Sequence, residues 1–268
     1  MAFNPEIHKQ VWQKLNQSQI ITEIDNISFI PIFVFDSINS TNIKLWELID
    51  RGEKVPVGVI ALQQTAGKGQ WGKNWVSADG GLYLSIALDL DLDFQDNSHL
   101  VMATAWGIAT VLRHHELPVT IKWSNDLILN QRKLGGIKIE ARNVQNKIAK
   151  AVVGVGINWR NSVPDVGISL ESYYRNKPQP NIASLEELAA ITAYGIVFGY
   201  QYYLAVGIEQ LLANYLAILD SLGKQVTVNN CPGEVMGVTT DGRLKVKLRS
   251  PGATTEINLA PGQISLGY

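Results

Sequence analysis

The 268-residue chain is poor in cysteine, which limits both its disulfide and its thiol chemistry. With Cys231 as the only cysteine, no internal disulfide can form, and nothing in cysteine usage points to secretion. We expect Cys231, just before Pro232-Gly233, to lie in a turn, and no histidine or asparagine context marks it as a nucleophile. The four histidines show no H-x-x-x-H or cysteine–histidine spacing, which argues against a structural transition-metal site.

The chain also lacks an excess of charge and a long hydrophobic run. Lysine and arginine total 23 and aspartate and glutamate total 24, so the formal net charge is −1, unlike the basic balance of a nucleic-acid binder. No apolar run approaches the ~20 residues that a membrane helix needs, and the N-terminal residues contain no apolar signal core. We therefore expect a cytoplasmic protein that binds neither nucleic acid nor a membrane.

Hydrophobic periodicity predicts a mixture of strands with a few helices. We expect helices over 4–16, 43–51, 98–116 and, with glycine interruptions, 184–222, and strands over 27–35, 55–62, 82–90, 119–123, 127–129, 134–141 and 148–157. From Gly223 onward, short alternating strands are separated by turn pairs, of which Asp241-Gly242 is a strong hairpin signal. The pattern predicts an α+β fold, with a mixed, largely antiparallel sheet and flanking helices over 1–222 and a small β-barrel over 223–268.

A glycine-rich loop over 65–81 contains a G-x-G-x-x-G pattern from Gly67 to Gly72. A dinucleotide-binding fingerprint requires a helix directly after these glycines, whereas the next residues contain Gly80-Gly81 and lead into a strand. The loop instead offers backbone N–H groups and lysines to an anion, and its two tryptophans could pack against a flat ring such as adenine. A mobile surface loop with ordinary lysines is the alternative interpretation.

Three later segments also concentrate polar side chains at strand ends. Lys122 lies on a strand that ends at Asn125-Asp126, and a carboxylate there could bind Mg²⁺ carried by a nucleotide. Lys133 stands at the start of another strand beside two glycines, and Asn158 ends a glycine-containing strand, where close approach of a ligand or backbone is expected. Each segment could also be an ordinary turn. Together they supply cations, a carboxylate and amides but no activated nucleophile, which favours charge neutralisation between two anions over acyl-enzyme chemistry.

The order of these motifs resembles the biotin protein ligase family. The motifs are STN, QTAGKGQWGKNW, KWSNDLIL, RKLGGIKIE, GVGIN and the small C-terminal barrel. The resemblance covers roughly residue 35 to the end of the chain. It implies a class II synthetase-like catalytic domain with an SH3-like barrel. It also implies that ATP, with Mg²⁺, activates biotin to biotinyl-5′-AMP before transfer to a lysine of a biotin carrier domain of acetyl-CoA carboxylase.

The resemblance also implies roles for individual residues. The residues matched to catalysis are Lys68, Lys122 and Lys133. Those matched to biotin binding are Ser40, Thr41, Asn42, Gln64, Lys68, Gly69, Gln70 and Lys133. Those matched to ATP binding are Gly67, Trp71, Trp75, Asn125, Asp126 and Asn158, with Asp126 also placed near Mg²⁺.

The chain departs from the family pattern at three positions. The family loop often reads G-R-G-R-x-G, whereas this chain has Lys68 and Gln70 in place of the arginines. Lysine keeps the charge but loses bidentate geometry, and Gln70 removes a cation, which puts tight retention of the adenylate in doubt. Ser124 stands where the family usually has proline.

Two alternatives stay open from the sequence, a lipoate or octanoate ligase of the same superfamily and a non-catalytic nucleotide- or biotin-binding module. Some family members carry an N-terminal DNA-binding domain. Only about 35 residues precede the catalytic motifs here, so we expect a monofunctional ligase that does not bind DNA. The sequence leaves a monomer and a homodimer equally open.

Overall fold

The computed structural model of the chain describes residues 3–18, 20–24, 26–93, 97–145, 147–175, 177, 179–250 and 252–267. Seven strands form one sheet in the order β1-β2-β3-β7-β6-β5-β4. They are β1 (Ile32–Ile38), β2 (Val57–Gln64), β3 (Leu82–Asp93), β4 (Thr120–Lys122), β5 (Asp126–Leu129), β6 (Arg132–Val144) and β7 (Lys147–Ile157). Only β1 and β2 pair in parallel among these neighbours, so the predicted mixed, largely antiparallel sheet is confirmed.

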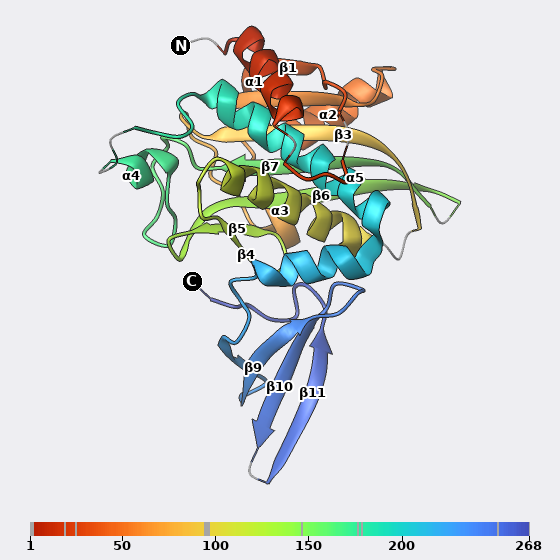
Figure 1. Cartoon of the computed structure of the whole chain (residues 1–268), viewed down its shortest axis with the longest axis vertical. Helices are drawn as coiled ribbons and strands as arrows, with labels where there is room; N and C mark the ends of the chain where they lie inside the picture. Colours follow the sequence, from red (N-terminus) through yellow and green to blue (C-terminus); the bar gives the residue numbers. More distant parts are fainter. Residues whose placement is uncertain are drawn as a thin grey trace.

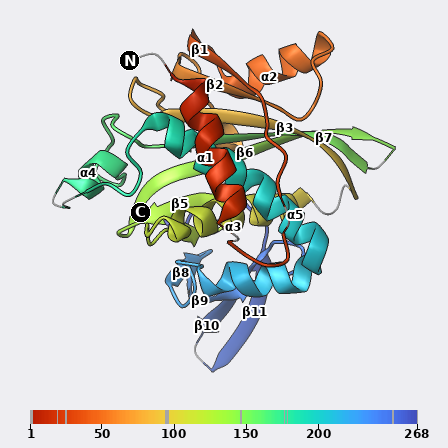
Figure 2. The same ribbon diagram turned by 45° about the horizontal axis from the view of Figure 1, so that its top comes forward.

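Helices cover the two faces of this sheet unequally (Figures 1 and 2). One face packs against α1 (Pro5–Gln17), α3 (Asn97–His114) and α5 (Leu185–Ala217), and the other packs against α2 (Thr41–Asp50). Because strand side chains alternate, Leu84 of β3 joins the large core under α3 and α5, while Ala87 joins the small core under α2. Beyond α2, the second face is left open for a cavity.

Two expectations from the sequence need correction. The strand expected over 27–35 begins only at Ile32, after Pro31, which has no N–H for a ladder hydrogen bond. Ile27 and Ile30 before it are buried outside the sheet, and Trp12 Nε1 of α1 donates to the Ile27 carbonyl (3.0 Å). A short helix, α4 (Leu170–Tyr174), was not expected; it carries a capping box between Ser169 and Ser172.

The helices α3 and α5 cross with their backbones in contact. Cβ atoms added to Gly107 or Gly199 would overlap the backbone of the facing helix, and one on Gly195 would lie 2.7 Å from Ile108 Cα. Further on, α5 bends at Gly207, which has φ 78° and ψ 179°. The glycine interruptions expected in this helix therefore serve a close crossing and a kink. No helix of the described ranges is both long and apolar enough to cross a membrane.

A second, four-stranded antiparallel sheet projects from the first (Figure 1). Its strands are β8 (Gln225–Val228), β9 (Cys231–Val238), β10 (Leu244–Ser250) and β11 (Ala253–Leu259). The hairpin turn predicted at Asp241-Gly242 is confirmed between β9 and β10. The turn expected at Cys231 is wrong: Asn229 and Asn230 adopt positive φ and make the turn, so Cys231 starts β9 opposite Val228.

Candidate active site

A cavity of about 380 Å³ opens on the α2 face of the large sheet. Its floor is formed by β5, β6 and β7, and its walls by the start of α2, the glycine-rich loop and the segment 261–266. The residues predicted for the site that line it are Ser40, Thr41, Asn42, Gln64, Lys68, Gly69, Gln70, Trp71, Trp75, Lys122, Asn125, Asp126 and Lys133. Lys68, Lys122 and Lys133 come from three separate segments and line the same cavity.

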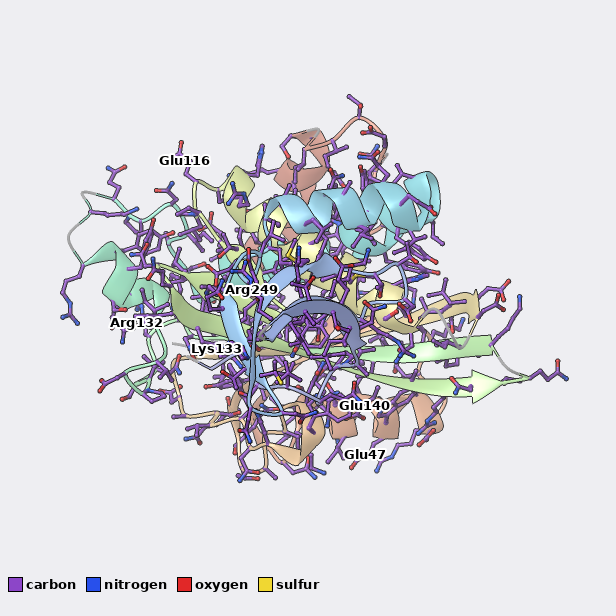
Figure 3. The ribbon with its side chains drawn as sticks, turned by 90° about the horizontal axis from the view of Figure 1, so that it is seen from below. Glu47, Glu116, Arg132, Lys133, Glu140 and Arg249 are labelled. Carbon is purple, nitrogen blue, oxygen red and sulfur yellow. The ribbon has the colours of Figure 1, made fainter. Side chains whose placement is uncertain are left out.

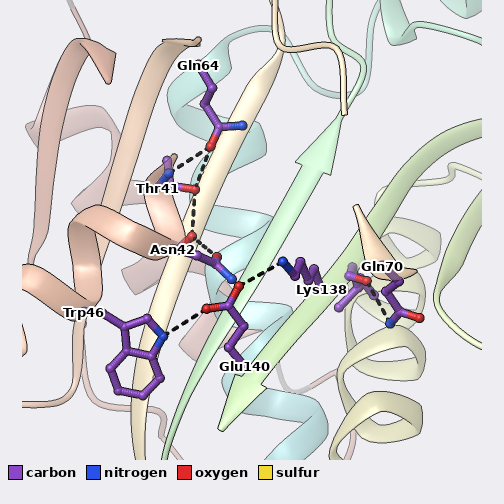
Figure 4. A network of polar contacts seen from close by, with 9 residues as sticks. Thr41, Asn42, Trp46, Gln64, Gln70, Lys138 and Glu140 are labelled. Atoms are coloured by element: carbon purple, nitrogen blue, oxygen red, sulfur yellow. Dashed lines mark hydrogen bonds and ion pairs between the residues drawn. The ribbon is translucent and has the colours of Figure 1, made fainter. Parts of the chain in front are cut away.

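The first turn of α2 closes one end of the cavity with hydrogen bonds (Figure 4). Ser40 is the extended N-cap residue, and the Thr41 N–H, which has no partner inside the helix, donates to Gln64 Oε1 (2.8 Å). The Ser85 hydroxyl from β3 lies 2.7 Å from both Thr41 Oγ1 and Asn42 Oδ1. Hydrogen-bond donors and acceptors therefore gather at this end of the cavity. We call it the polar end, and its residues are Ser40, Thr41, Asn42 and Gln64.

The opposite end contains an ion pair between neighbouring strands. Lys133 Nζ lies 2.7 Å from Asp126 Oδ1 and 5.4 Å from the centre of the Trp75 ring. The Trp75 ring itself lies over Gly156, where a Cβ atom would obstruct it, and an added Cβ on Gly136 would be in ordinary contact with it. The glycines of β7 do allow close approach, but by side chains, Trp75 over Gly156 and Asn42 over Gly154, and not by the ligand or backbone that was expected.

Lys122 is the most buried of the three lysines that were predicted to be catalytic. Its residue is 8% exposed, and its ammonium donates to the Gly267 carbonyl. Burial lowers the pKa of Lys122 to about 8; the positive charge of Lys133 also lowers this pKa, while the negative charge of Asp126 raises it. The site therefore holds a lysine whose charge state changes near neutral pH.

The glycine-rich loop lies over the cavity floor without a following helix. Only the short turn Gln70–Gly72 interrupts it before β3, which supports the rejection of a dinucleotide fingerprint. Gln70 Nε2 donates to the Ile137 carbonyl of β6 (3.3 Å), as Asn125 Nδ2 does (2.8 Å). Trp71 has φ 57° and is 68% exposed, so it is not packed as a buried anchor.

Two predicted site residues, Gly67 and Asn158, do not line the cavity. Gly67 packs closely against Ser77 and Trp75 within the loop. Asn158 Nδ2 donates to the Lys133 carbonyl (3.2 Å), and its oxygen accepts from Asn161. Their placement gives no support to nucleotide contacts; Asn158 instead fixes the backbone of Lys133.

The sequence reasoning missed two parts of the site. Lys138 and Glu140 of β6 line the cavity floor, although the RKLGGIKIE motif was assigned a role only through Lys133. Their alternation with the buried Ile137 was the available signal, because residues 136, 138 and 140 must share the other face of β6. The segment 261–266, beyond the last strand, also lines the cavity, and no sequence pattern indicated its return to the first sheet.

The acidic residues of the site are too few to form a metal centre by themselves. Among the described residues, no group of three or more histidine, cysteine, aspartate or glutamate side chains could hold a metal ion. A single carboxylate such as Asp126 suits Mg²⁺ that arrives on a nucleotide, because Mg²⁺ takes its other ligands from phosphates and water.

Comparisons with known proteins agree with this geometry. Residues 34–158 match the model of the Biotin/lipoate A/B protein ligase family. The bifunctional ligase/repressor BirA of Escherichia coli is 36% identical over 150 residues, which cover 54% of this chain and 45% of that protein. BirA of Bacillus spizizenii is 25% identical over 217 residues, 78% of this chain and 67% of that protein. A biotin protein ligase from Aquifex aeolicus, solved in complex with biotin and ATP, has a TM-score of 0.66 at 18% identity, covering 86% of this chain and 100% of that chain.

Proposed function

We propose that the chain is a biotin protein ligase, which joins biotin to a lysine of an acceptor protein with ATP, because residues 34–158 match the model of the Biotin/lipoate A/B protein ligase family. The observation that carries the proposal is the single cavity that Lys68, Lys122 and Lys133 line together with the polar end. Three cations suit the approach of two anions, the carboxylate of a small acid and the phosphates of ATP.

The proposed reaction has two steps. A biotin carboxylate oxygen attacks the α-phosphorus of MgATP, and the bond to the leaving pyrophosphate breaks, giving biotinyl-5′-AMP. The ε-amine of the acceptor lysine then attacks the acyl carbon, losing a proton as AMP leaves. Holding both anions in one cavity supplies proximity, and the lysines reduce their mutual repulsion.

The predicted residues that line the cavity each have a place in this scheme, which leaves out Gly67 and Asn158. Lys68, Lys122 and Lys133 neutralise the carboxylate and the α-phosphate, and Asp126 positions Mg²⁺ on the phosphates. The polar end holds the biotin head through Ser40, Thr41, Asn42 and Gln64. Gly69 and Gln70 would cover biotin, while Trp71, Trp75 and Asn125, which also line the cavity, would contact the nucleotide.

The polar end favours biotin over lipoate or octanoate. Biotin ends in a cyclic urea with two N–H donors and one carbonyl acceptor, whereas lipoate ends in a dithiolane and octanoate in a methyl group. Neither apolar group could form hydrogen bonds at this end, so both would lack the interactions that the urea can make there.

ATP–pyrophosphate exchange with biotin, lipoate and octanoate in parallel tests the activity. We expect exchange that depends on biotin and is far weaker with the other two acids. Exchange with lipoate or octanoate alone would identify the other ligase of the superfamily, and biotin binding without any exchange would indicate a non-catalytic module.

The proposed acceptor is the biotin carrier domain of a carboxylase. Adding a purified carrier domain with biotin and ATP should increase its mass by one biotinyl group. Replacing the acceptor lysine of that domain with arginine is the control and should abolish the increase.

A further inference from the structure

The ion pair between Lys138 and Glu140 lies on the cavity floor, where a pair of apolar residues would suffice for packing. Lys138 Nζ is 3.0 Å from Glu140 Oε1, and both residues line the cavity. Side chains two apart on a strand share a face, so both rise from β6 on the side of α2. A partly exposed ion pair adds little stability, which leaves its presence in the site to be explained by ligand binding.

Glu140 is held in place from α2. The Trp46 indole N–H donates to Glu140 Oε2 (3.1 Å), so each carboxylate oxygen has its own donor (Figure 4). Burial alone would raise the pKa of Glu140, but hydrogen bonds from Lys138, Asn42 and Trp46 lower it overall. The carboxylate is therefore a fixed anion that directs the Lys138 ammonium to one position.

That position belongs to the polar end of the cavity. Lys138 pairs across the sheet with Gly154, and the Asn42 side chain lies directly over Gly154. Lys133 and Glu140 occupy different stretches of β6, as Figure 3 shows. Lys138 thus presents its charge beside Asn42, away from the Lys133–Asp126 pair.

On the premise of the proposed function, we propose that Lys138 binds the urea head of biotin as a specificity-determining residue, with Glu140 as its positioning residue. The ammonium donates to the urea carbonyl oxygen, the strongest acceptor of that ring, in a charge-assisted hydrogen bond. The alternative is that Lys138 neutralises the biotin carboxylate and the α-phosphate at the other end of the cavity. The proposed role predicts a change in KM for biotin, whereas the alternative predicts a change in kcat.

The test measures KM for biotin and for ATP, and kcat, in pyrophosphate exchange by Lys138→Met. Methionine keeps the length and apolar stem of lysine without its charge. We expect KM for biotin to rise about ten- to a hundredfold, the loss expected for one hydrogen bond to a charged group, with KM for ATP and kcat within about twofold. Lys138→Arg should restore most of the affinity for biotin.

The control variant is Lys147→Met, which removes the same group from an exposed ion pair of β7, Lys147 Nζ to Asp91 Oδ1 at 2.6 Å, and should change neither KM. Glu140→Gln should raise KM for biotin less than Lys138→Met does. Calorimetric titration of biotin into nucleotide-free protein should show the same order of affinities.

The outcomes separate this inference from the function on which it rests. An unchanged KM for biotin in Lys138→Met, or a fall in kcat alone, would overturn the role of Lys138 while leaving a biotin ligase. If the wild-type protein catalysed exchange with lipoate or octanoate but not with biotin, both the role of Lys138 and the proposed function would be overturned. If Lys138→Met does not fold, Lys138→Gln is measured in its place against the same expectations.

Discussion

Lys133 is held by contacts that leave its ammonium directed into the cavity. Its N–H donates to the Val166 carbonyl (2.9 Å), and its carbonyl accepts from Ile168 N (2.9 Å) and from Asn158. The side chain then reaches Asp126 across the strand pair. Because Asp126 already holds the ammonium, the side chain loses less freedom when an anion binds, which is how a preorganised electrostatic group acts.

We predict that Lys133→Ala lowers the rate of biotin-dependent pyrophosphate exchange by about 100-fold or more, the usual effect of removing one preorganised charge stabiliser. Its melting temperature should stay close to that of the wild type, because the backbone contacts remain. Arg132→Ala is the control, since the neighbouring Arg132 side chain donates to the Asp165 carbonyl in an exposed position. Exchange at the wild-type rate in Lys133→Ala would refute the proposed role.

Lys122 makes the activity sensitive to pH. Its pKa of about 8 means that the ammonium is charged below pH 8 and loses its proton as the pH rises through that value. We predict that kcat/KM for biotin-dependent exchange falls above about pH 8, because this ratio reports the free enzyme. Lys122→Arg, which stays charged, should move the fall to higher pH, and an unchanged profile in this variant would exclude Lys122 as the titrating group.

The same lowered pKa has a consequence for stability. An unfolded lysine keeps its proton up to about pH 10.5, so between pH 8 and 10.5 the unfolded chain binds more protons than the folded chain at this position. The contribution of Lys122 to the free energy of unfolding therefore increases as the pH rises across that range. A change of opposite sign, in a comparison with Lys122→Met over this range, would contradict the burial of the ammonium.

At the scale of elements, the crossing of α3 and α5 depends on the absence of side chains. Replacing a glycine at an exposed helical position by alanine usually raises the free energy of unfolding by about 1 kcal/mol. Gly199 is different, because its Cβ would overlap the Ala103 carbonyl of α3. We predict that Gly199→Ala instead lowers the free energy of unfolding by about 1–3 kcal/mol, the cost of overpacking.

Chemical denaturation measures this effect. Ala213→Gly, on an exposed part of α5, is the control for helix propensity and should lower the free energy of unfolding by about 1 kcal/mol. Stabilisation by Gly199→Ala would show that the helices can separate without loss.

The elements were largely predictable, because each depends on local periodicity or turn chemistry. The helix at α3 and the hairpin at Asp241-Gly242 follow from such patterns, and the predicted fold class is confirmed. What could not be predicted depends on contacts between distant segments. Asn158 looked like a ligand contact because it ends a glycine-rich strand, but its partner is the Lys133 carbonyl, 25 positions earlier. Lys138 was missed for a similar reason. The position of α2 decides which face of β6 lines the cavity, and the sequence of β6 does not show that position.

At the scale of the whole molecule, the second sheet completes the cavity of the first. The Trp123 indole N–H donates to the Gly242 carbonyl (3.0 Å), and His99 Nε2 lies 2.8 Å from the Thr240 carbonyl. Residues 261–266, which follow β11, then line the cavity, and the Gly267 carbonyl accepts from Lys122. Activity should therefore depend on how the β9–β10 turn docks, although that turn lies outside the cavity.

Gly242→Ala tests this dependence. Gly242 has φ +80°, and an added Cβ would lie 2.6 Å from Ser98 Cβ at the start of α3, so alanine must push the turn away from the first sheet. Gly252→Ala is the matched control: Gly252 has φ +78° in the β10–β11 turn, and its added Cβ would meet nothing within 4 Å. Both substitutions introduce similar backbone strain, of about 1–3 kcal/mol, so their difference isolates the docking contact.

We predict that Gly242→Ala reduces biotin-dependent exchange at least about tenfold, while Gly252→Ala keeps nearly wild-type activity. Hydrogen exchange should show faster labelling of residues 261–267 in Gly242→Ala only. The displaced β9–β10 turn would move the second sheet, and the segment 261–267 that follows β11 would move off the cavity with it. Equal activity losses in both variants would mean that strain in the second sheet, and not its docking, limits the enzyme. Unchanged activity in Gly242→Ala would mean that the first sheet alone holds both substrates, and the segment 261–266 would then have no part in binding.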